Sequence, residues 1–282
     1  MKFAFYDDFE LAVVVGDRLV PVDGRIDLGA DQPPQRRLET LISRYDKLKD
    51  ALAEVADKGK GSVAVGDVRL RAPVPCPTQL ICTIRNYLDG RPRSAYPEFF
   101  LKSPRSVIGH GDTVVLPPDE AKVFHHEAEL AVVIGQGGEE IPEDEAMSHV
   151  FGYTGFIDVS ARDIGASYYR KKGFRTFGPM GPYLVTADEI GDPQKLTAKF
   201  WVQGKQRQEF STNQMDNSIA RLINVASTVS GLGVGDVIST GTWHQGMGPL
   251  QDGDVATMEF EKIGTIAINV SDPSHRSWPV ED

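Results

Sequence analysis

The stretch FHHEAELAVVIG, residues 124–135, contains the pattern that decides the fold. It alternates at first, then becomes apolar and ends at a glycine, which predicts a β-strand. Side chains of a strand point to opposite faces in turn, so Glu127 and Glu129 share one face with His125. Two carboxylates on one strand face repel each other unless a positive charge lies between them. The pattern therefore predicts either a cation site or an acidic strand face exposed to solvent.

A third carboxylate follows in the stretch FGYTGFIDVSARD, residues 151–163. Its apolar part predicts a second strand over residues 153–159, in which Asp158 is the one charged residue. Asp158 would complete a site with Glu127 and Glu129. Oxygen ligands of this kind suit Mg²⁺ or Mn²⁺ first, and also Ca²⁺, rather than Zn²⁺. We therefore predict that these three residues bind a divalent cation.

The composition is that of an ordinary globular protein with room for a large core. The chain has 282 residues, of which 40% are hydrophobic and 25% are charged. The net charge of -10 argues against binding to nucleic acid or to an anionic membrane, and no apolar run approaches the length of a membrane span. Two cysteines cannot form a disulfide framework, and the first residues do not resemble a signal peptide. We therefore expect a cytoplasmic protein.

Two parts of the chain differ in their predicted elements. The N-terminal part has short β runs, a hairpin, and a helix whose apolar residues recur from Leu38 to Val55 at spacings of three and four. A basic, glycine-rich segment ends that helix, and a run of prolines follows. We therefore expect a small N-terminal α+β module, residues 1–70, and a second, larger domain, residues 71–282.

The larger domain is expected to be mainly β. From residue 79 onward β runs dominate, and helices are predicted only after Pro142 and from Met215. Strands that do not alternate with helices argue against a doubly wound sheet. The glycine-rich loop that begins at Gly135 is not a dinucleotide-binding loop, because Glu140 stands where the third glycine is required. The predicted fold class is α+β, mainly β, with a mixed, rolled β structure in the larger domain.

Several motifs resemble the fumarylacetoacetate hydrolase family. Besides the two stretches quoted above, they are SVIGHGDTVVLP, KGFRTFGPMGPYLVTADEI and GDVISTGT, at residues 106–117, 172–190 and 235–242. The resemblance covers most of the chain, and the order of its motifs makes it specific for the family but not for a substrate. It implies a mixed β-roll catalytic domain and a homodimer.

The resemblance also implies roles for residues around the predicted cation. Lys172 matches the family's active-site lysine, which would stabilise an oxyanion, although the basic residues around it also fit a solvated surface. Arg162 matches an arginine near the metal, where it would bind substrate, or else it pairs with its acidic neighbour. Thr176, Gly241 and Thr242 match positions that bind substrate oxygens. The last two stand in a turn of small residues, which suits an anion but is equally typical of a turn after a strand.

One motif departs from the family pattern. Members that hydrolyse C–C bonds usually carry N-Y-x-x-H-A, in which a histidine of the lid, with a following glutamate, activates water. In the corresponding NYLDG segment, Gly90 stands where that histidine is expected. Arg85, Arg91 and Arg93 flank this gap and are candidates to bind a substrate carboxylate. We predict that His244, in the sequence TGTWHQGMGPL, supplies the missing base, unless it is an ordinary surface histidine.

The predicted cation and the resemblance together imply a class of reaction. A divalent cation with open positions chelates two oxygens of a 1,3-dicarbonyl or 2-oxo acid and stabilises the enolate that forms when a bond to the α-carbon breaks. We therefore expect a metal-dependent hydrolase that cleaves a C–C bond of a small, anionic acylpyruvate or other 2-oxo acid, as in the catabolism of aromatic compounds. Two alternatives stay open. One is a lyase or isomerase (decarboxylase, dehydratase or tautomerase) that needs no lid histidine, and the other is an inactive, metal-binding member of the family.

Overall fold

The structure is a computed structural model that describes residues 1–90, 92, 96–165 and 167–278. Arg91 and Arg93, two of the arginines expected near the substrate, lie outside the described residues. Strands dominate the described part of the chain and form three sheets, of twelve, five and two strands. The predicted fold class, α+β and mainly β, is therefore confirmed.

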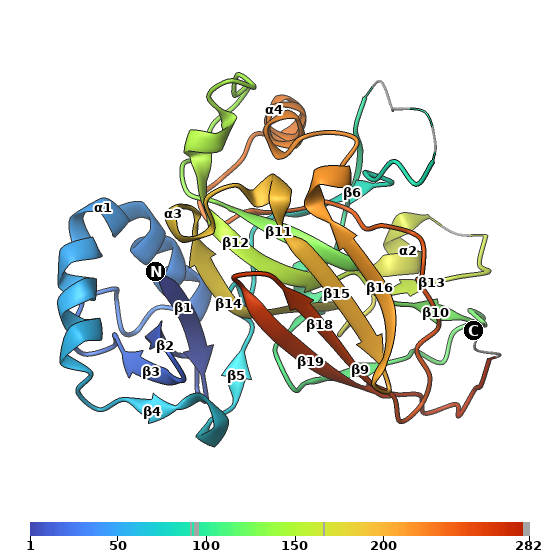
Figure 1. Ribbon diagram of the computed structural model, residues 1–282, viewed down its shortest axis with the longest axis horizontal. Helices are drawn as coiled ribbons and strands as arrows, with labels where there is room; N and C mark the ends of the chain where they lie inside the picture. The colour runs from blue at the N-terminus through green and yellow to red at the C-terminus, as the bar shows by residue number, and fades with distance from the viewer. Residues whose placement is uncertain (91, 93–95, 166, 279–282) are drawn as a thin grey trace.

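The largest sheet runs through the whole molecule (Figure 1). Its strands are β1 (Lys2–Tyr6), β2 (Glu10–Val15), β3 (Arg18–Pro21), β4 (Val63–Ala64), β5 (Leu70–Arg71), β6 (Leu80–Ile84), β7 (Glu98–Leu101), β8 (Val107–Ile108), β11 (Ala128–Ile134), β12 (Val150–Ile157), β14 (Gly178–Thr186) and β17 (Val237–Ser239). They follow the order β4-β3-β2-β1-β14-β12-β11-β17-β6-β7, with β5 beside β1 and β8 beside β14. Parallel and antiparallel pairs both occur, so the sheet is mixed.

The five-stranded sheet packs against the middle of the large one (Figure 1). It has the order β16-β15-β18-β19-β9, and β10 with β13 forms the third, two-stranded sheet. The bounds are β9 (Thr113–Val115), β10 (Phe124–His125), β13 (Ser160–Ala161), β15 (Thr197–Val202), β16 (Lys205–Ser211), β18 (Val255–Phe260) and β19 (Gly264–Ser271). Apolar side chains between the two larger sheets form the main core, among them Leu130, Val132, Phe200 and Met258.

Four α-helices are described: α1 (Pro34–Lys58), α2 (Tyr168–Lys172), α3 (Ala187–Ile190) and α4 (Ile219–Ser230). The helix expected from Met215 begins at Ile219, because the Ser218 side chain accepts a hydrogen bond from the Arg221 N–H and caps the helix there. The helix expected after Pro142 is a single 3₁₀ turn, at Ala146–His149. Among the described residues, no helix is both long enough and apolar enough to cross a membrane.

The N-terminal part has the predicted hairpin, β2 with β3, and the predicted long helix, α1. The helix ends where Gly59 takes a left-handed conformation and its N–H bonds to the last carbonyls. Strand β1 pairs with β14, with Phe3 opposite Leu184, so the sheet of this part continues into the large sheet. The division at residue 70 therefore falls within one continuous sheet, and the two-domain description stays a prediction.

Candidate active site

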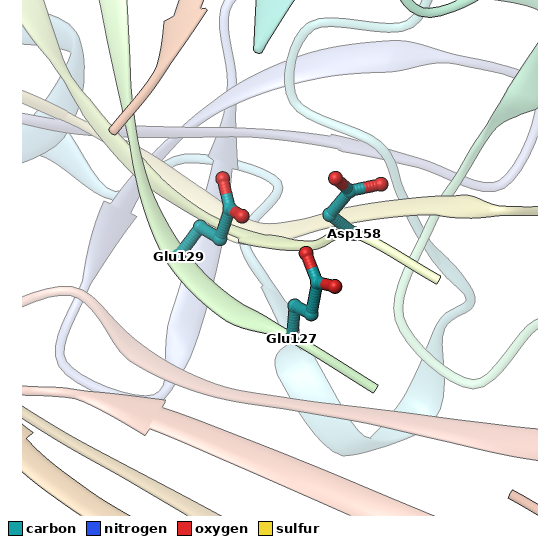
Figure 2. Close-up of side chains that lie close together, drawn as sticks. All are labelled: Glu127, Glu129 and Asp158. Atoms are coloured by element: carbon teal, nitrogen blue, oxygen red, sulfur yellow. The ribbon is translucent and has the colours of Figure 1, made fainter. Parts of the chain in front are cut away.

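Three carboxylates converge at one end of the paired strands β11 and β12. Glu129 lies in β11, Glu127 precedes it, and Asp158 follows β12. The antiparallel register sets Ala128 opposite Ile157, and the Asp158 N–H donates to the Glu127 carbonyl at 2.9 Å. Each residue offers one carboxylate oxygen, and these three oxygens lie within 4.8 Å of one another (Figure 2). The structure thus brings together the three predicted metal ligands.

The donor set fits a divalent cation. All three carboxylates are buried, and an isolated buried charge is costly. Burial, followed by the charges of Asp158 and Glu127, raises the pKa of the Glu129 carboxyl well above its usual range. A divalent ion at this point would remove the repulsion, and oxygen ligands are those that Mg²⁺, Mn²⁺ and Ca²⁺ prefer. Glu127, Glu129 and Asp158 would hold such an ion.

Lys172, the last residue of α2, reaches the carboxylates from the side. Its Nζ atom lies 2.7 Å from Glu127 Oε2 and 2.5 Å from Asp158 Oδ2. Burial favours the neutral amine, but the charges of Asp158 and Glu127 outweigh it and raise the pKa of Lys172 above its ordinary value. The predicted lysine is therefore a buried, charged member of the cluster and not a solvated surface group.

A second buried lysine, Lys102, was not predicted. Its Nζ atom lies 2.6 Å from Asp158 Oδ1 and 3.3 Å from the Val159 carbonyl, and its side chain has no exposed surface. The sequence holds a weak signal for this placement, because a residue two positions after the buried Phe100 of β7 points to the same face as Phe100. Lys102 and Lys172 together contact both oxygens of Asp158.

Backbone and hydroxyl donors hold Glu129. Its Oε2 atom accepts hydrogen bonds from the Ser239 hydroxyl and, at 3.1 Å, from the Gly241 N–H. Gly241 was expected to bind a substrate oxygen, but the structure directs its N–H to this carboxylate. Its left-handed backbone, with a φ of 81°, turns the chain after β17 toward Glu129.

Arg162 and Ser160 hold the other glutamate, Glu127. The Arg162 guanidinium pairs with Glu127 Oε1, and the Ser160 hydroxyl donates to the same oxygen at 3.1 Å. Arg162 was expected either near the metal, where it would bind substrate, or paired with Asp163. The structure pairs it with Glu127, a predicted metal ligand. Lys172 and Arg162 together lower the pKa of Glu127 well below its usual range, against the opposing effect of burial.

A cavity of about 180 Å³ opens beside the carboxylates. Glu127 and Glu129 are its acidic residues, and its other charged residues are basic: Arg85, Arg162, Lys171 and Lys172. Thr242 also lines the cavity, and its hydroxyl accepts a hydrogen bond from Gln208 Nε2 at 3.1 Å. The cavity therefore combines an acidic floor, suited to a cation, with basic walls, suited to an anion.

His244 lines the same cavity and pairs with Asp89. Its Nδ1 atom lies 2.5 Å from Asp89 Oδ2, and its backbone N–H donates to Asp89 Oδ1 at 3.2 Å. Asp89 belongs to the NYLDG segment, in which Gly90 stands at the position of the expected lid histidine. Sequence reasoning did not select Asp89, because nothing local connects two residues that are 155 positions apart.

Two expected residues lie elsewhere. The Thr176 hydroxyl accepts a hydrogen bond from the Val115 N–H at 2.9 Å, and Thr176 does not line the cavity, because its left-handed backbone (φ 68°) turns the side chain toward β9. His125 was expected on the face of Glu127 and Glu129 but lines a different cavity. The alternation fails there because β10 ends at His125 and pairs with β13, so the strand does not run on into β11.

Comparison with known proteins agrees with this geometry. The family described as Fumarylacetoacetate (FAA) hydrolase C-terminal matches residues 80–271. Oxaloacetate tautomerase YisK of Bacillus subtilis is 33% identical, over 95% of this chain and 99% of that protein. Maleylpyruvate hydrolase of Aquipseudomonas alcaligenes is 31% identical, over 96% of this chain and 99% of that protein.

A solved structure is also similar over nearly the whole chain. Maleylpyruvate hydrolase from Sphingobium sp. SYK-6, in complex with manganese (II) ion and pyruvate, has a TM-score of 0.87 and 34% identity, over 96% of this chain and 99% of that one. The matched residues include all three converging carboxylates, both buried lysines and the Asp89–His244 pair. The chain is an enzyme and belongs to the fumarylacetoacetate hydrolase family.

Proposed function

We propose that this protein is a metal-dependent hydrolase that cleaves a C–C bond of a small acylpyruvate or a related 2-oxo acid. The observation that carries the proposal is the group of three buried carboxylates at the floor of a basic cavity. Mg²⁺ or Mn²⁺, or secondarily Ca²⁺, held by Glu127, Glu129 and Asp158, would supply positive charge to the substrate oxygens on which negative charge develops. The relative solved with manganese and pyruvate supports this, because pyruvate is a product of acylpyruvate cleavage.

Lys172 would act as a hydrogen-bond donor to a developing oxyanion. Its contacts with Glu127 and Asp158 keep the ammonium group protonated, so it donates protons in hydrogen bonds and does not accept one from water. It also lines the cavity, where a substrate oxygen can reach it. Lys172 is therefore proposed as an electrostatic group, and the general base must be another residue.

The basic walls of the cavity favour an anionic substrate. Arg162 and Thr242 line it and are proposed to bind substrate oxygens. Arg85 lines both this cavity and a neighbouring one of about 430 Å³. A substrate with a second carboxylate would therefore place that group toward Arg85.

The homodimer and the cytoplasmic location expected from the sequence stay predictions.

A tautomerase is the second candidate function. Gly90 stands in place of the lid histidine that activates water in other members of the family. A tautomerase does not need that histidine, because it only moves a proton between carbon and oxygen. Similarity to an oxaloacetate tautomerase over 95% of the chain also favours it. The two functions differ in whether water enters the product.

The test uses protein stripped with EDTA and reloaded with Mn²⁺ or Mg²⁺. Acylpyruvates of increasing acyl length, maleylpyruvate and oxaloacetate are supplied in H₂¹⁸O. Hydrolysis places the label in a newly released carboxylate, whereas tautomerisation changes the enol-to-keto ratio of oxaloacetate without releasing a fragment. We expect Lys172→Met to lower kcat by about 10²-fold to 10³-fold, as loss of an oxyanion donor does. Lys47→Met, at an exposed position of α1, is the control.

Two results would contradict the proposal. If none of the substrates turns over with either metal, the protein is an inactive, metal-binding member of the family. If turnover is fast but no ¹⁸O enters a carboxylate, the tautomerase replaces the hydrolase.

A further inference from the structure

We propose that Asp89 and His244 form a catalytic pair that activates the attacking water, in place of the lid histidine that is absent at Gly90. This inference rests on the proposed hydrolase function and adds the route by which the proton leaves water. His244 would be the general base and would touch the water. Asp89 would be a positioning residue, which acts through the imidazole ring.

Two contacts fix the orientation of the ring. Asp89 Oδ2 lies 2.5 Å from His244 Nδ1, and Asp89 Oδ1 accepts the backbone N–H of His244 at 3.2 Å. The carboxylate is nearly buried, with 9% of its side chain exposed, whereas the imidazole is 35% exposed and lines the cavity. A carboxylate at Nδ1 selects the tautomer with a proton on Nδ1. Nε2 is then the ring atom with a free lone pair.

The loop that carries Asp89 is tied to the loop that carries His244. Asn86, which is buried, donates from Nδ2 to the carbonyl of Thr240 at 3.0 Å and to that of Asn217 at 3.1 Å. Asp89 and Gly90 both have left-handed backbones, with φ values of 44° and 75°, which turn the NYLDG segment back on itself. A strained conformation at a non-glycine residue persists only where its surroundings hold it. The turn that has Gly90 in place of a histidine thus brings the Asp89 carboxylate to His244.

The other charged groups of the cavity are unsuited to accept a proton from water. The arginine and lysine side chains, Lys171 among them, carry donors and no acceptor, and the neighbouring carboxylates keep Lys172 charged. Glu127 and Glu129 would be occupied by the cation. Among the described residues that line the cavity, His244 is therefore the one with a ring nitrogen that can accept a proton from water.

In the proposed step, His244 takes a proton from water and later returns it to carbon. A water proton moves to His244 Nε2 while the water oxygen bonds to the acyl carbonyl carbon, and the carbonyl electron pair moves to its oxygen. When that pair returns, the C–C bond breaks and its electrons pass to the methylene carbon of the pyruvate fragment. The proton on Nε2 then moves to that carbon. One water is consumed, and a carboxylic acid and pyruvate are released.

The test compares His244→Gln and Asp89→Asn with a matched control. Asp252 and His275 form a second pair, with Oδ2 and Nδ1 2.7 Å apart, on a histidine side chain that is 80% exposed and lines none of the cavities described above. Asp252→Asn therefore breaks a chemically similar pair outside the site. Three quantities are measured: hydrolysis of an acylpyruvate in H₂¹⁸O, exchange of pyruvate methyl protons in D₂O, and the ¹⁵N NMR shifts of the metal-free protein.

We expect His244→Gln to lower kcat for hydrolysis by about 10²-fold or more, and Asp89→Asn by at least about 10-fold, with KM changed by less than about 3-fold. Exchange of pyruvate methyl protons should fall together with hydrolysis in both variants, because His244 carries the proton in both reactions. In the wild type, ¹⁵N shifts should show a proton on His244 Nδ1, and in Asp89→Asn that proton should move to Nε2. Asp252→Asn should match the wild type in all three measurements.

The outcomes separate the two proposals. If His244→Gln hydrolyses at the wild-type rate, the pair is not the base, and the hydrolase function stands without it. An unchanged His244 tautomer in Asp89→Asn overturns the positioning role, whatever the rates are. If the wild type exchanges pyruvate protons but incorporates no ¹⁸O into a carboxylate, both the hydrolase and the water-activating pair are wrong.

Discussion

The Nζ atom of Lys102 lies 2.6 Å from Oδ1 of Asp158, and both side chains are buried. Lys172 contacts the other oxygen of the same carboxylate. Asp158 thus contacts two ammonium groups. Glu129 instead accepts hydrogen bonds from Ser239 and Gly241, and its pKa is raised by burial and by the charges of Asp158 and Glu127. A divalent ion at Glu129 would therefore complete the charge balance of the cluster.

Lys102→Met tests the buried pair. Removing one partner of a buried ion pair leaves an uncompensated charge, so we expect the metal-free protein to lose about 3–5 kcal/mol of unfolding free energy. Mn²⁺ should restore part of this loss, because it supplies positive charge to Asp158. Urea unfolding with and without Mn²⁺ measures both effects.

The control for that experiment is Lys195→Met. Lys195 pairs with Asp192 at 2.9 Å, but both side chains are exposed, and such pairs contribute little. The unfolding midpoint of Lys195→Met should match that of the wild type. Equal losses in the two variants would show that burial of Lys102 does not matter.

Glu129→Gln tests the metal site with little change in shape. Burial and the charges of Asp158 and Glu127 raise the pKa of Glu129 and so favour its neutral form, which glutamine resembles. We therefore expect the metal-free variant to unfold within about 1 kcal/mol of the wild type. Stabilisation by Mn²⁺, which grows with RT ln(1 + [L]/Kd), should be lost because the variant cannot supply the third charged ligand.

Thermal unfolding at several Mn²⁺ concentrations, with calorimetry of Mn²⁺ binding, checks this prediction. Glu120→Gln, at an exposed carboxylate, should keep the full metal response. Unchanged Mn²⁺ affinity in Glu129→Gln would remove this residue from the metal site.

The cluster of three carboxylates could be predicted because its residues lie close together in the sequence, at the ends of two consecutive strands. Glu129 lies in β11 and Glu127 directly before it, and β12 pairs with β11 in antiparallel register and brings Asp158 alongside Glu127. Lys102 and Asp89 could not be found in this way, since their contacts join residues 56 and 155 positions apart. Such contacts depend on how sheets stack, which a single sequence does not encode in its periodicity.

His110→Asn tests a pH effect on folding away from the site. Burial lowers the pKa of His110, and its Nδ1 atom accepts the Ala267 N–H at 3.2 Å. Because the folded pKa is below the unfolded value of about 6.5, the stabilisation is complete above that pH and is lost as the pH falls below it. Asparagine keeps an acceptor but does not titrate.

We therefore expect the unfolding free energy of the wild type to fall more steeply than that of His110→Asn between about pH 7.5 and pH 5.5. Urea titrations at four pH values would measure the two slopes. Parallel slopes would mean that His110 is protonated in the folded state as readily as in the unfolded state.

Gly246→Ala tests whether the loop of His244 needs its close approach to β16. A Cβ atom at Gly246 would lie 1.8 Å from the carbonyl oxygen of Arg207, so the loop would have to move. Gly253 has nearly the same left-handed backbone, with a φ of 80° against 81°, but nothing lies within 4 Å of the added atom. The two alanine variants therefore share the cost of the backbone conformation, roughly 1–2 kcal/mol, and differ in the collision.

We expect the unfolding free energy of Gly253→Ala to fall only by that backbone cost, and its hydrolytic rate to stay unchanged. Gly246→Ala should lose more stability, and its kcat should fall by about 10-fold to 10²-fold, because a displacement of about 1 Å in a catalytic group has effects of this size. Mn²⁺ binding should stay unchanged in both, since Glu129 lies in β11, Glu127 directly before it and Asp158 directly after β12, all outside that loop. If Gly246→Ala loses stability but hydrolyses as fast as Gly253→Ala, the position of His244 does not limit the reaction, and the water-activating role of its pair with Asp89 would have to be abandoned.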